Sequence, residues 1–292
     1  MNILLIYNPV SGKSESRESR IGKIMLELGA EDALISVYQT KKKGDGFERL
    51  KMIDSSAYDL IVVCGGDGTL HEIVNATLKL GLNIPIGYIP FGSTNDYAKN
   101  LGIKPRNAIK NIKEMKLKRL DIGEFNGEFF NYVAAFGAFT EITYITPQDI
   151  KKIVGYMAYV LEGIKALPEI RPIHFKCKTD DGVIEDDVIV GMITNTTSVA
   201  GVKRKEDDIR LDDGKMEYIF VKFPKNIIET EAILFKIASG DFDSAFLYHG
   251  QSSHFEILSD EITWTLDGEA GGSASSVIID THKKAFEIVT GR

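Results

Sequence analysis

Residues 60–80 read LIVVCGGDGTLHEIVNATLKL, and this stretch decides the fold. Its first five residues, Leu60–Cys64, are all apolar, which is typical of a strand buried on both faces of a parallel sheet. From Thr69 to Leu80 the apolar residues recur at helical spacing. The glycines between them allow close approach of the backbone to a ligand, and a helix N-terminus attracts phosphate. The stretch therefore predicts a strand, a phosphate-binding turn and a helix.

The turn also carries an acid, Asp67, whose carboxylate can hold Mg²⁺ or orient a nucleotide. It is not the dinucleotide-binding fingerprint, because that pattern requires a third glycine where His71 stands. The alternative is a plain glycine-rich turn. The coincidence of three glycines, an acid and a threonine at the end of a strand argues for the phosphate site.

Strands and helices alternate on both sides of this stretch. Other strands are predicted at Asn2–Tyr7, Ala33–Gln39 and Ile84–Ile89, and helices at Ser16–Leu28, Phe47–Ile53 and Ala108–Met115. This alternation predicts an α/β fold with a doubly wound parallel sheet, which binds ligands at the carboxyl ends of its strands.

Two more polar loops follow predicted strands. The loop Asn8–Ser14 ends in Gly-Lys-Ser like a Walker A motif, but the first glycine of that motif would fall at Tyr7, so the match fails. A plain turn and a ligand loop both remain open there. The loop Pro90–Asp96 follows the fourth strand. All three loops would meet at one edge of the sheet, which favours a ligand site.

The pattern changes after Asp121, where short strands separated by turn signals such as Asn126-Gly127 follow one another. We predict a nucleotide-binding domain at 1–122 and a mainly β domain at 123–279, with about 280–292 able to return to the first. A helix is predicted within the second domain at Ile150–Lys165.

The composition is that of a folded protein of 292 residues and 32.4 kDa, a length that suits two domains. The net charge is −7, whereas nucleic-acid binders usually carry an excess of positive charge. The two cysteines are far apart, which argues against a disulfide scaffold. No apolar run approaches the ~18 residues of a membrane-spanning helix. We expect a cytoplasmic protein that reaches any lipid substrate from the membrane surface.

The segments NPVSGK, GGDGTLHEIVN and IPFGSTNDYAKNLGI, in this order and spacing, resemble the diacylglycerol kinase catalytic-domain family. The similarity is to its soluble bacterial branch of diacylglycerol and related lipid kinases. The segments DIG at 121–123, LDDG at 211–214 and LDGE at 266–269 also fit, so the resemblance covers nearly the whole chain. It implies a nucleotide-binding α/β domain like that of NAD kinases and diacylglycerol kinases. A β-sandwich lipid-acceptor domain would follow, with the active site in the cleft between the two.

The resemblance also implies roles for individual residues. Asp67 and Asp96 would place the nucleotide and a catalytic Mg²⁺, with Asp121 as a supporting acid. The general base would be Asp267 or Glu269, an alternative that stays open. The nucleotide site would consist of Asn8, Pro9, Val10, Ser11, Gly12, Lys13, Thr40, Gly65, Gly66, Asp67, Gly68, Thr69, Leu70, His71, Glu72, Ser93 and Asn95. A structural Mg²⁺ would be held by the Asp213 side chain and main-chain oxygens of Arg210 and Lys215.

The implied function is an ATP- and Mg²⁺-dependent kinase that phosphorylates the hydroxyl of a membrane lipid, foremost diacylglycerol to phosphatidate. Phosphoryl transfer requires positioning, charge neutralisation and a base, and the loops and acids above supply them. Other acceptors remain open, phosphatidylglycerol and sphingoid lipids among them, because His71, Ser93 and the segment 196–208 depart from the family pattern. Further alternatives are NAD kinase, which shares the GGDGT loop, and a nucleotide-binding regulatory protein without activity.

The partners follow from the same interpretation. Basic residues gather at Lys41–Lys43, Lys104–Arg119 and Lys151-Lys152. They are either solvated faces or a surface for transient contact with anionic lipid at the inner face of the membrane. The oligomeric state stays open, with a homodimer as one alternative.

Overall fold

The computed structural model describes residues 1–9, 17–29, 33–92, 95–137, 171–196, 210–239 and 242–291. The chain splits into two compact units. The first unit comprises Met1–Leu120 with Lys284–Arg292, and the second comprises Asp121–Lys283.

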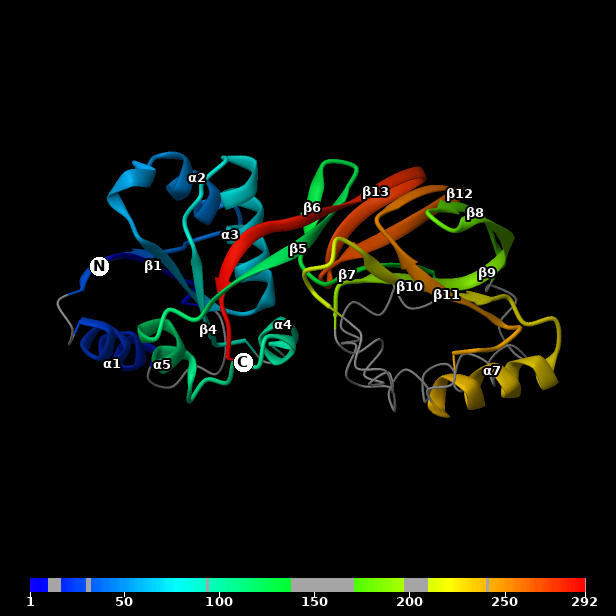
Figure 1. Cartoon of the computed structure of the whole chain (residues 1–292), viewed down its shortest axis with the longest axis horizontal. Coiled ribbons are helices and arrows are strands. Elements are labelled where there is room, and N and C mark those ends of the chain that lie inside the picture. The colour runs from blue at the N-terminus through cyan, green and yellow to red at the C-terminus, as the bar shows by residue number, and fades with distance from the viewer. Residues whose placement is uncertain are drawn as a thin grey trace. The chain divides into compact units, whose positions relative to one another are not determined.

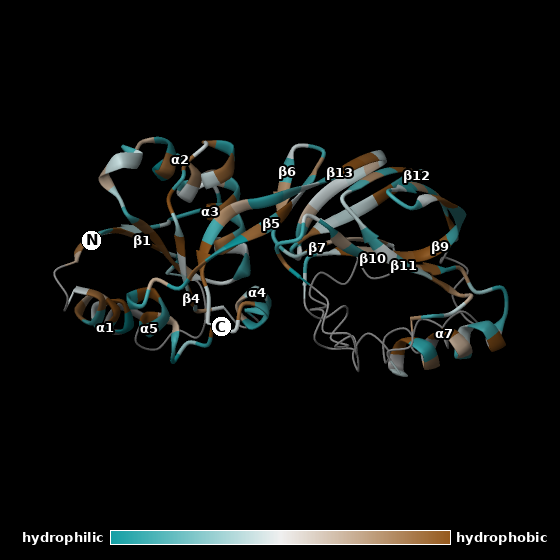
Figure 2. Ribbon diagram, in the orientation of Figure 1, coloured by the Kyte–Doolittle hydropathy of each residue, from teal (hydrophilic) through white to brown (hydrophobic). Residues whose placement is uncertain are grey.

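The first unit is built on a parallel sheet in the strand order β13-β4-β3-β1-β2. The four strands from the first 120 residues are β1 (Asn2–Tyr7), β2 (Leu34–Gln39), β3 (Leu60–Gly65) and β4 (Ile86–Pro90). β3 and β4 are buried at every residue, as their unbroken apolar sequence requires. Figure 2 shows these strands as brown ribbons between more polar helices.

Helices cover both faces of this sheet. They are α1 (Arg17–Gly29), α2 (Asp45–Lys51), α3 (Asp67–Lys79), α4 (Asp96–Asn100) and α5 (Ala108–Lys113), with a short 3₁₀ turn at Ser55–Ala57. Figure 1 shows α2 and α3 on one side of the sheet and α1 and α5 on the other. This is the doubly wound arrangement that the sequence predicts.

The order of the strands singles out one position in the sheet. From β1 the chain goes to β2 on one side, and then returns to form β3 on the other side of β1. The connections after β1 and β3 therefore lead away in opposite directions. In open α/β sheets ligands bind at such a switch point, outside the carboxyl ends of the strands.

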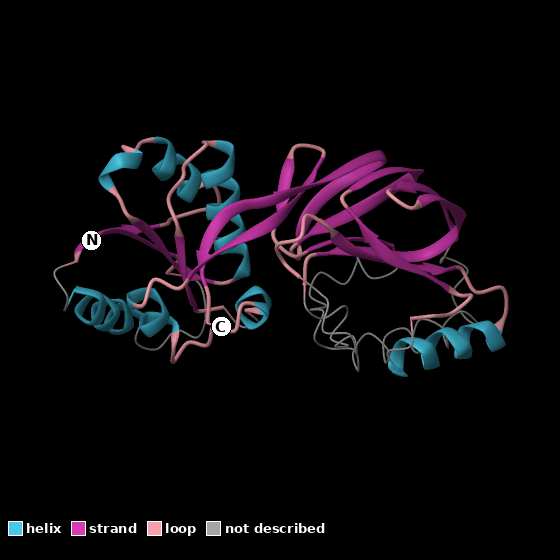
Figure 3. Cartoon of the chain, viewed as in Figure 1, coloured by secondary structure: helices cyan, strands magenta, loops and turns pink. Residues whose placement is uncertain are grey.

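The second unit is rich in antiparallel strands (Figure 3). Its elements are β5 (Leu117–Phe125), β6 (Glu128–Phe130), β7 (Val133–Gly137), β8 (Ile173–Thr179), β9 (Gly182–Thr194), β10 (Met216–Lys222), α7 (Ile227–Ser239), β11 (Leu247–Ser252), β12 (His254–Leu266) and β13 (Glu269–Val289). Of these, β5 begins and β13 ends in the first unit. β9 and β12 change partners along their length, since each pairs with β8 in one part and with β7 in another. The strands are therefore joined by continuous hydrogen-bonded pairing, and they surround a common core.

Aromatic rings fill that core. The Phe136 ring lies 4.6 Å from the Trp264 ring and 5.3 Å from the Phe175 ring, between ring centroids, and Phe175 lies 4.7 Å from Phe220. All four side chains are buried. The Phe136 ring occupies the space that a side chain at Gly191 of β9 would fill. Glycine at this position therefore makes room for the ring.

The elements largely follow the sequence prediction. α3 begins at Asp67 rather than Thr69, because Gly66 is already the N-cap. β13 is far longer than the segment of about 280–292 that the sequence predicts could return to the first unit, and its Ile288 pairs with Ile86 there. The predicted helix at Ile150–Lys165 and most of the segment 196–208 lie outside the described residues. In the described part of the chain, no helix is long and apolar enough to span a membrane.

We expect Gly191→Ala to lower the free energy of unfolding by about 1–3 kcal/mol, because the new methyl group would displace a ring packed among other rings. The control is Gly22→Ala in α1, where a methyl group would meet no atom within 4 Å. That change should instead stabilise the helix by about 0.5–1 kcal/mol. Denaturant titration of both variants measures the difference. Equal effects of the two substitutions would contradict the packing argument.

Candidate active site

The loops after β1 and β3 are joined at the switch point. The main-chain N–H of Asn8 donates to the carbonyl oxygen of Cys64 over 3.0 Å. The Asn8 side-chain amide donates to the Thr69 hydroxyl over 3.3 Å, in the first turn of α3. Asn8 is therefore fixed against the glycine-rich turn. The helix N-terminus beside it offers main-chain N–H groups and the positive end of the helix dipole, which suits phosphate.

The turn after β3 and the loop after β4 approach each other through glycines. A Cβ atom at Gly92 would lie 2.7 Å from the Cα atom of Gly66, and one at Gly66 would lie 3.3 Å from the Cα atom of Gly92. Only glycine at both positions allows this approach without displacing the backbone. A side chain at Gly65 would lie 2.6 Å from the Thr69 side chain. Because these glycines have no side chains, their main-chain atoms are not covered by side chains of their own.

A buried tyrosine links the same two loops. The Tyr88 hydroxyl lies 3.2 Å from the Gly65 carbonyl oxygen and 3.4 Å from the Asn95 Oδ1 atom. Asn95 has a positive φ of 50° and its amide donates to the Gly92 carbonyl over 2.6 Å. Burial, and then the charges of Asp67 and Asp96, raise the pKa of Tyr88 well above its usual value. The hydroxyl therefore stays protonated and serves as a donor.

The carboxylate of Asp67 binds the start of α4. It accepts main-chain N–H groups of Asp96 over 3.0 Å and Tyr97 over 3.2 Å, so it acts as the cap of that short helix. Asp96 is itself buried, and its Oδ1 atom pairs with the Lys99 ammonium over 2.9 Å. Its Oδ2 atom has no hydrogen-bond partner among the described residues. The Asp67 carboxylate thus lies against the main chain of Asp96, and the buried Asp96 Oδ2 atom is of the hard oxygen type that could hold a cation.

Glu72, which is predicted to contact ATP, binds main-chain groups at the start of α2. Its two oxygens accept the main-chain N–H groups of Gly44, over 3.2 Å, and Gly46, over 2.7 Å, at the start of α2. It therefore connects α3 to the loop that contains Thr40. The Thr40 main-chain N–H donates to the carbonyl oxygen of Tyr7, next to Asn8. His71 is half-buried beside Asn75 of the same helix.

Five of the predicted nucleotide-site residues lie outside the described residues, namely Val10, Ser11, Gly12, Lys13 and Ser93. The structure brings the others into contiguous loops and the first turns of α3 and α4. Gly68 and Leu70 lie in the first turn of α3, and Pro9 follows Asn8.

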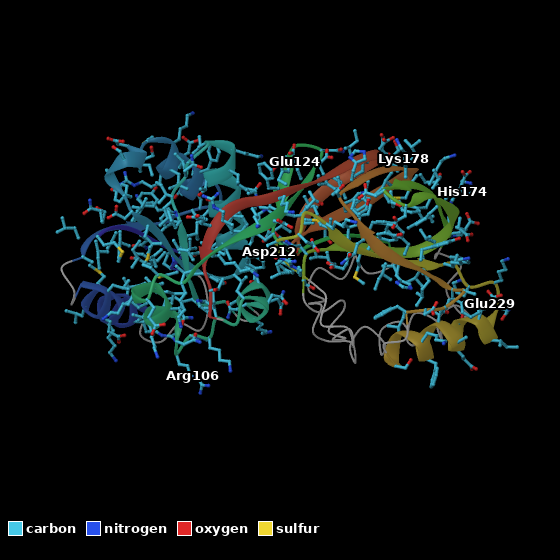
Figure 4. The ribbon with its side chains drawn as sticks, viewed as in Figure 1. Arg106, Glu124, His174, Lys178, Asp212 and Glu229 are labelled. Carbon is cyan, nitrogen blue, oxygen red and sulfur yellow. The ribbon has the colours of Figure 1, made fainter. Side chains whose placement is uncertain are left out.

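The predicted structural metal site lies in the second unit, at the turn that precedes β10. The buried Asp121 carboxylate accepts the Gly214 N–H over 2.5 Å, and its main-chain N–H donates to the Leu211 carbonyl. Asp213 accepts the Lys215 N–H over 3.0 Å. Figure 4 labels Asp212 in the same turn, where Arg210 donates to it over 3.4 Å. Asp121 therefore fixes this turn, while the main-chain ligation by Arg210 and Lys215 stays a prediction.

The two candidate bases occupy one hairpin turn, between β12 and β13. Asp267 is buried, and its carboxylate accepts the main-chain N–H groups of Asn131, Tyr132 and Val133 as well as the Asn131 amide. A carboxylate offers about four acceptor sites, and these donors occupy them. Glu269 begins β13 and is half-buried.

Within the described ranges, no group of three or more His, Cys, Asp or Glu residues could hold a metal ion. A magnesium site of the expected kind does not require one, because Mg²⁺ usually binds one or two carboxylates and keeps several waters. The sequence analysis missed Tyr88 and Asn131. Neither belongs to a recognisable motif, and only the folded chain brings them to the loops that they bind.

Comparison with known proteins identifies the family. The model of the diacylglycerol kinase catalytic domain matches residues 2–125. A diacylglycerol kinase of Bacillus subtilis (strain 168) is 30% identical over 285 residues, which cover 96% of this chain and 93% of the relative. The chain belongs to the diacylglycerol kinase catalytic-domain family. A diacylglycerol kinase of Staphylococcus aureus (strain bovine RF122 / ET3-1) is 31% identical and covers 97% of this chain and 91% of its own length.

Solved structures share the fold over almost the whole chain. A diacylglycerol kinase structure from Bacillus anthracis str. Sterne has a TM-score of 0.74 at 22% identity, covering 99% of this chain and 97% of that one. A second structure from the same organism reaches 0.79 at 25% identity with the same coverage. The predicted family and α/β fold are therefore confirmed.

The contact between Gly66 and Gly92 predicts a specific effect on nucleotide binding. We expect Gly92→Ala to weaken binding of a non-hydrolysable ATP analogue at least ~10-fold, since a 1 Å displacement of site groups can cost ~100-fold. The control is Gly87→Ala in β4, the strand that precedes this loop, where the new Cβ would lie 3.1 Å from the Ile112 side chain in the core.

Both variants should lose stability, but only Gly92→Ala should lose affinity once the folded fraction is accounted for. Titration calorimetry measures the affinity, and thermal melting measures the stability. Unchanged affinity in Gly92→Ala would show that the approach of the two loops does not shape the nucleotide site.

Proposed function

We propose that this protein transfers the γ-phosphate of ATP to the hydroxyl of diacylglycerol and so forms phosphatidate. Its family and its near full-length relatives support the assignment as an ATP-dependent lipid kinase. The observation that carries the proposal is the set of joined loops at the switch point of the first unit, together with the carboxylates of Asp67 and Asp96.

The first unit would bind ATP. The predicted phosphate contacts comprise the loop from Asn8 to Lys13, the turn Gly65–Thr69, and Ser93 with Asn95. The glycine approach keeps side chains away from the backbone, so N–H groups can reach phosphate oxygens. Asn8 and Glu72 support this arrangement by fixing neighbouring loops against α3. We assign Glu72 to this support rather than to direct contact with the nucleotide.

The acids of the first unit suit a divalent cation. The Oδ2 atom of Asp96 is a buried, hard oxygen donor without a hydrogen-bond partner among the described residues, and Mg²⁺ prefers such ligands. Asp96 would hold the ion, and Asp67 would keep Asp96 in place through its main-chain N–H. When bound, Mg²⁺ neutralises charge on the phosphates of the nucleotide.

The second unit would bind the acceptor and supply the base. A general base requires an oxygen that can accept the proton of the attacking hydroxyl. The carboxylate of Asp267 is occupied by main-chain and amide donors, which favours Glu269 as the base and Asp267 as a structural acid. The proposal keeps the β-sandwich layout predicted for 123–279. It also keeps the structural Mg²⁺ at Asp213 and transient contact with the inner face of the membrane.

The acceptor is tested with purified protein, labelled ATP and a panel of acceptors. Mixed micelles containing diacylglycerol, phosphatidylglycerol or a sphingoid base are compared with NAD in solution. We expect label in phosphatidate and none in NAD. Label in NAD alone would overturn the lipid assignment, and label in a different lipid would correct the acceptor. EDTA should abolish transfer, and Mg²⁺ in excess should restore it.

The base is tested with isosteric variants of the two acids. We expect Glu269→Gln to lower kcat by about 10²–10⁴-fold, because proton transfer is lost, with ATP-analogue affinity unchanged. Asp267→Asn should lower the melting temperature, because an amide group would face donors. A variant Asp267→Asn that melts like the wild type and loses only kcat would reverse the two assignments.

A further inference from the structure

The turn that carries Asp267 has an unusual backbone. Asp267 adopts a positive φ of 53° and Gly268 one of 82°. Glycine adopts this conformation easily, but a residue with a side chain does so only when its surroundings hold it. The Asp267 carboxylate is also buried, which carries a desolvation cost of its own. Two unfavourable free-energy contributions, from the positive φ and from the buried carboxylate, therefore coincide at this turn.

Asn131 donates two of the hydrogen bonds that stabilise this turn. Its amide nitrogen donates to the Asp267 Oδ2 atom over 3.0 Å, and its main-chain N–H donates to the same atom over 2.6 Å. An ionised carboxylate can only accept, so the nitrogen of the Asn131 amide must face it. A flipped amide would place two oxygens against each other. The orientation of this side chain is therefore fixed by Asp267.

That orientation leaves the Oδ1 atom of the same side chain without a hydrogen bond in the described part of the chain. Asn131 is 1% exposed, and its Oδ1 atom has no hydrogen-bond partner among the described residues. A buried polar atom without a partner costs about 1–3 kcal/mol. A cost of this kind in a native protein calls for an explanation, and a functional constraint is one. Here the unpartnered oxygen is the consequence of directing the amide nitrogen at Asp267.

The contacts extend along the segment that precedes β7. Tyr132 and Val133 donate their main-chain N–H groups to the Asp267 Oδ1 atom, and the Asp267 N–H donates to the Val133 carbonyl over 2.8 Å. Glu269 is two residues beyond Asp267 and pairs with Leu266 across the turn. The conformation of the turn therefore determines where the Glu269 side chain starts and in which direction it leaves the backbone.

We propose that Asn131 is a positioning residue for phosphoryl transfer, which holds the Asp267 carboxylate and through it the turn that presents Glu269. This inference rests on the proposed function, in which Glu269 is the base. In this arrangement, Asn131 acts on Glu269 through Asp267. A base displaced by about 1 Å loses up to ~100-fold in rate, so the effect should appear in kcat rather than in nucleotide binding.

The main test compares Asn131→Ala with Asn126→Ala. Asn126 is the control, since it is a second asparagine of the same unit and its side chain bonds to β13 rather than to the turn. Its amide donates to the Ser276 carbonyl over 3.3 Å and its Oδ1 atom accepts the Ile278 N–H over 2.9 Å, away from the turn. Per folded molecule, we expect Asn131→Ala to lower kcat about 10- to 100-fold with ATP-analogue affinity unchanged. Asn126→Ala should lower only the melting temperature.

A second variant provides a readout that a purely structural role would not change. In Asn131→Asp the introduced carboxylate faces Asp267, so like charges raise the pKa of the pair. Protonation of the introduced group restores a donor to Asp267. We therefore expect the ratio of mutant to wild-type kcat to rise as the pH falls, measured below the melting temperature of both proteins. The variant Asn131→Ala, which cannot regain a donor, should show a constant ratio.

Wild-type kcat on the lipid that is phosphorylated is the reference, so the two proposals fail separately. No phosphorylation of any lipid, or full activity in Glu269→Gln, would contradict the proposed function. With that function intact, equal kcat per folded molecule in Asn131→Ala and Asn126→Ala would overturn the role of Asn131. Should Asn131→Asp not fold, the comparison of the two alanine variants decides alone.

Discussion

The carboxylate of Asp67 is the interaction on which the first unit's site depends. Asp67 is the first residue of α3, which follows β3, and its carboxylate caps α4, which follows β4. One carboxylate therefore joins two loops whose bonded residues are 29 positions apart in the sequence. This bond sets the position of Asp96, and the glycine contact between Gly66 and Gly92 becomes possible only when the loops are this close. An acid that looks like a simple ligand in the sequence is thus also the link that assembles the ligand site.

Much of the first unit can be predicted from residues 60–80 alone. The buried strand, the glycine turn and the amphipathic helix have local causes, and these appear in the order of apolar residues. The length of β13 could not be predicted, because its first part pairs with β12 and its end with β4. A partner as distant in the sequence as β4 leaves no periodic signal. The same holds for Tyr88, whose hydroxyl reaches two loops from the middle of an ordinary apolar strand.

The acids show the limit of motif reasoning more sharply. Asp267 and Glu269 lie two residues apart in one turn, and their sequence context gives no reason to prefer either as a base. Only the folded chain shows that the main-chain N–H groups of Asn131, Tyr132 and Val133 all bind the Asp267 carboxylate. Glu72 is a comparable case, because the Gly44 and Gly46 N–H groups that it accepts come from a different strand connection. Roles of this kind depend on which backbone groups are left over after the strands and helices have formed.

The return of β13 to the first unit has a consequence for how the protein is made. Residues 284–291 add an edge to the sheet of the first unit, where Ile288 pairs with Ile86, Thr290 bonds to Lys116 and Gly291 to Leu101. On the ribosome, the first 120 residues emerge long before these partners exist. Domains usually fold as they are synthesised, N-terminal first, and exposed strand edges in such intermediates favour aggregation. Strand β4 therefore stays unpaired on one side until residues 284–291 have been translated.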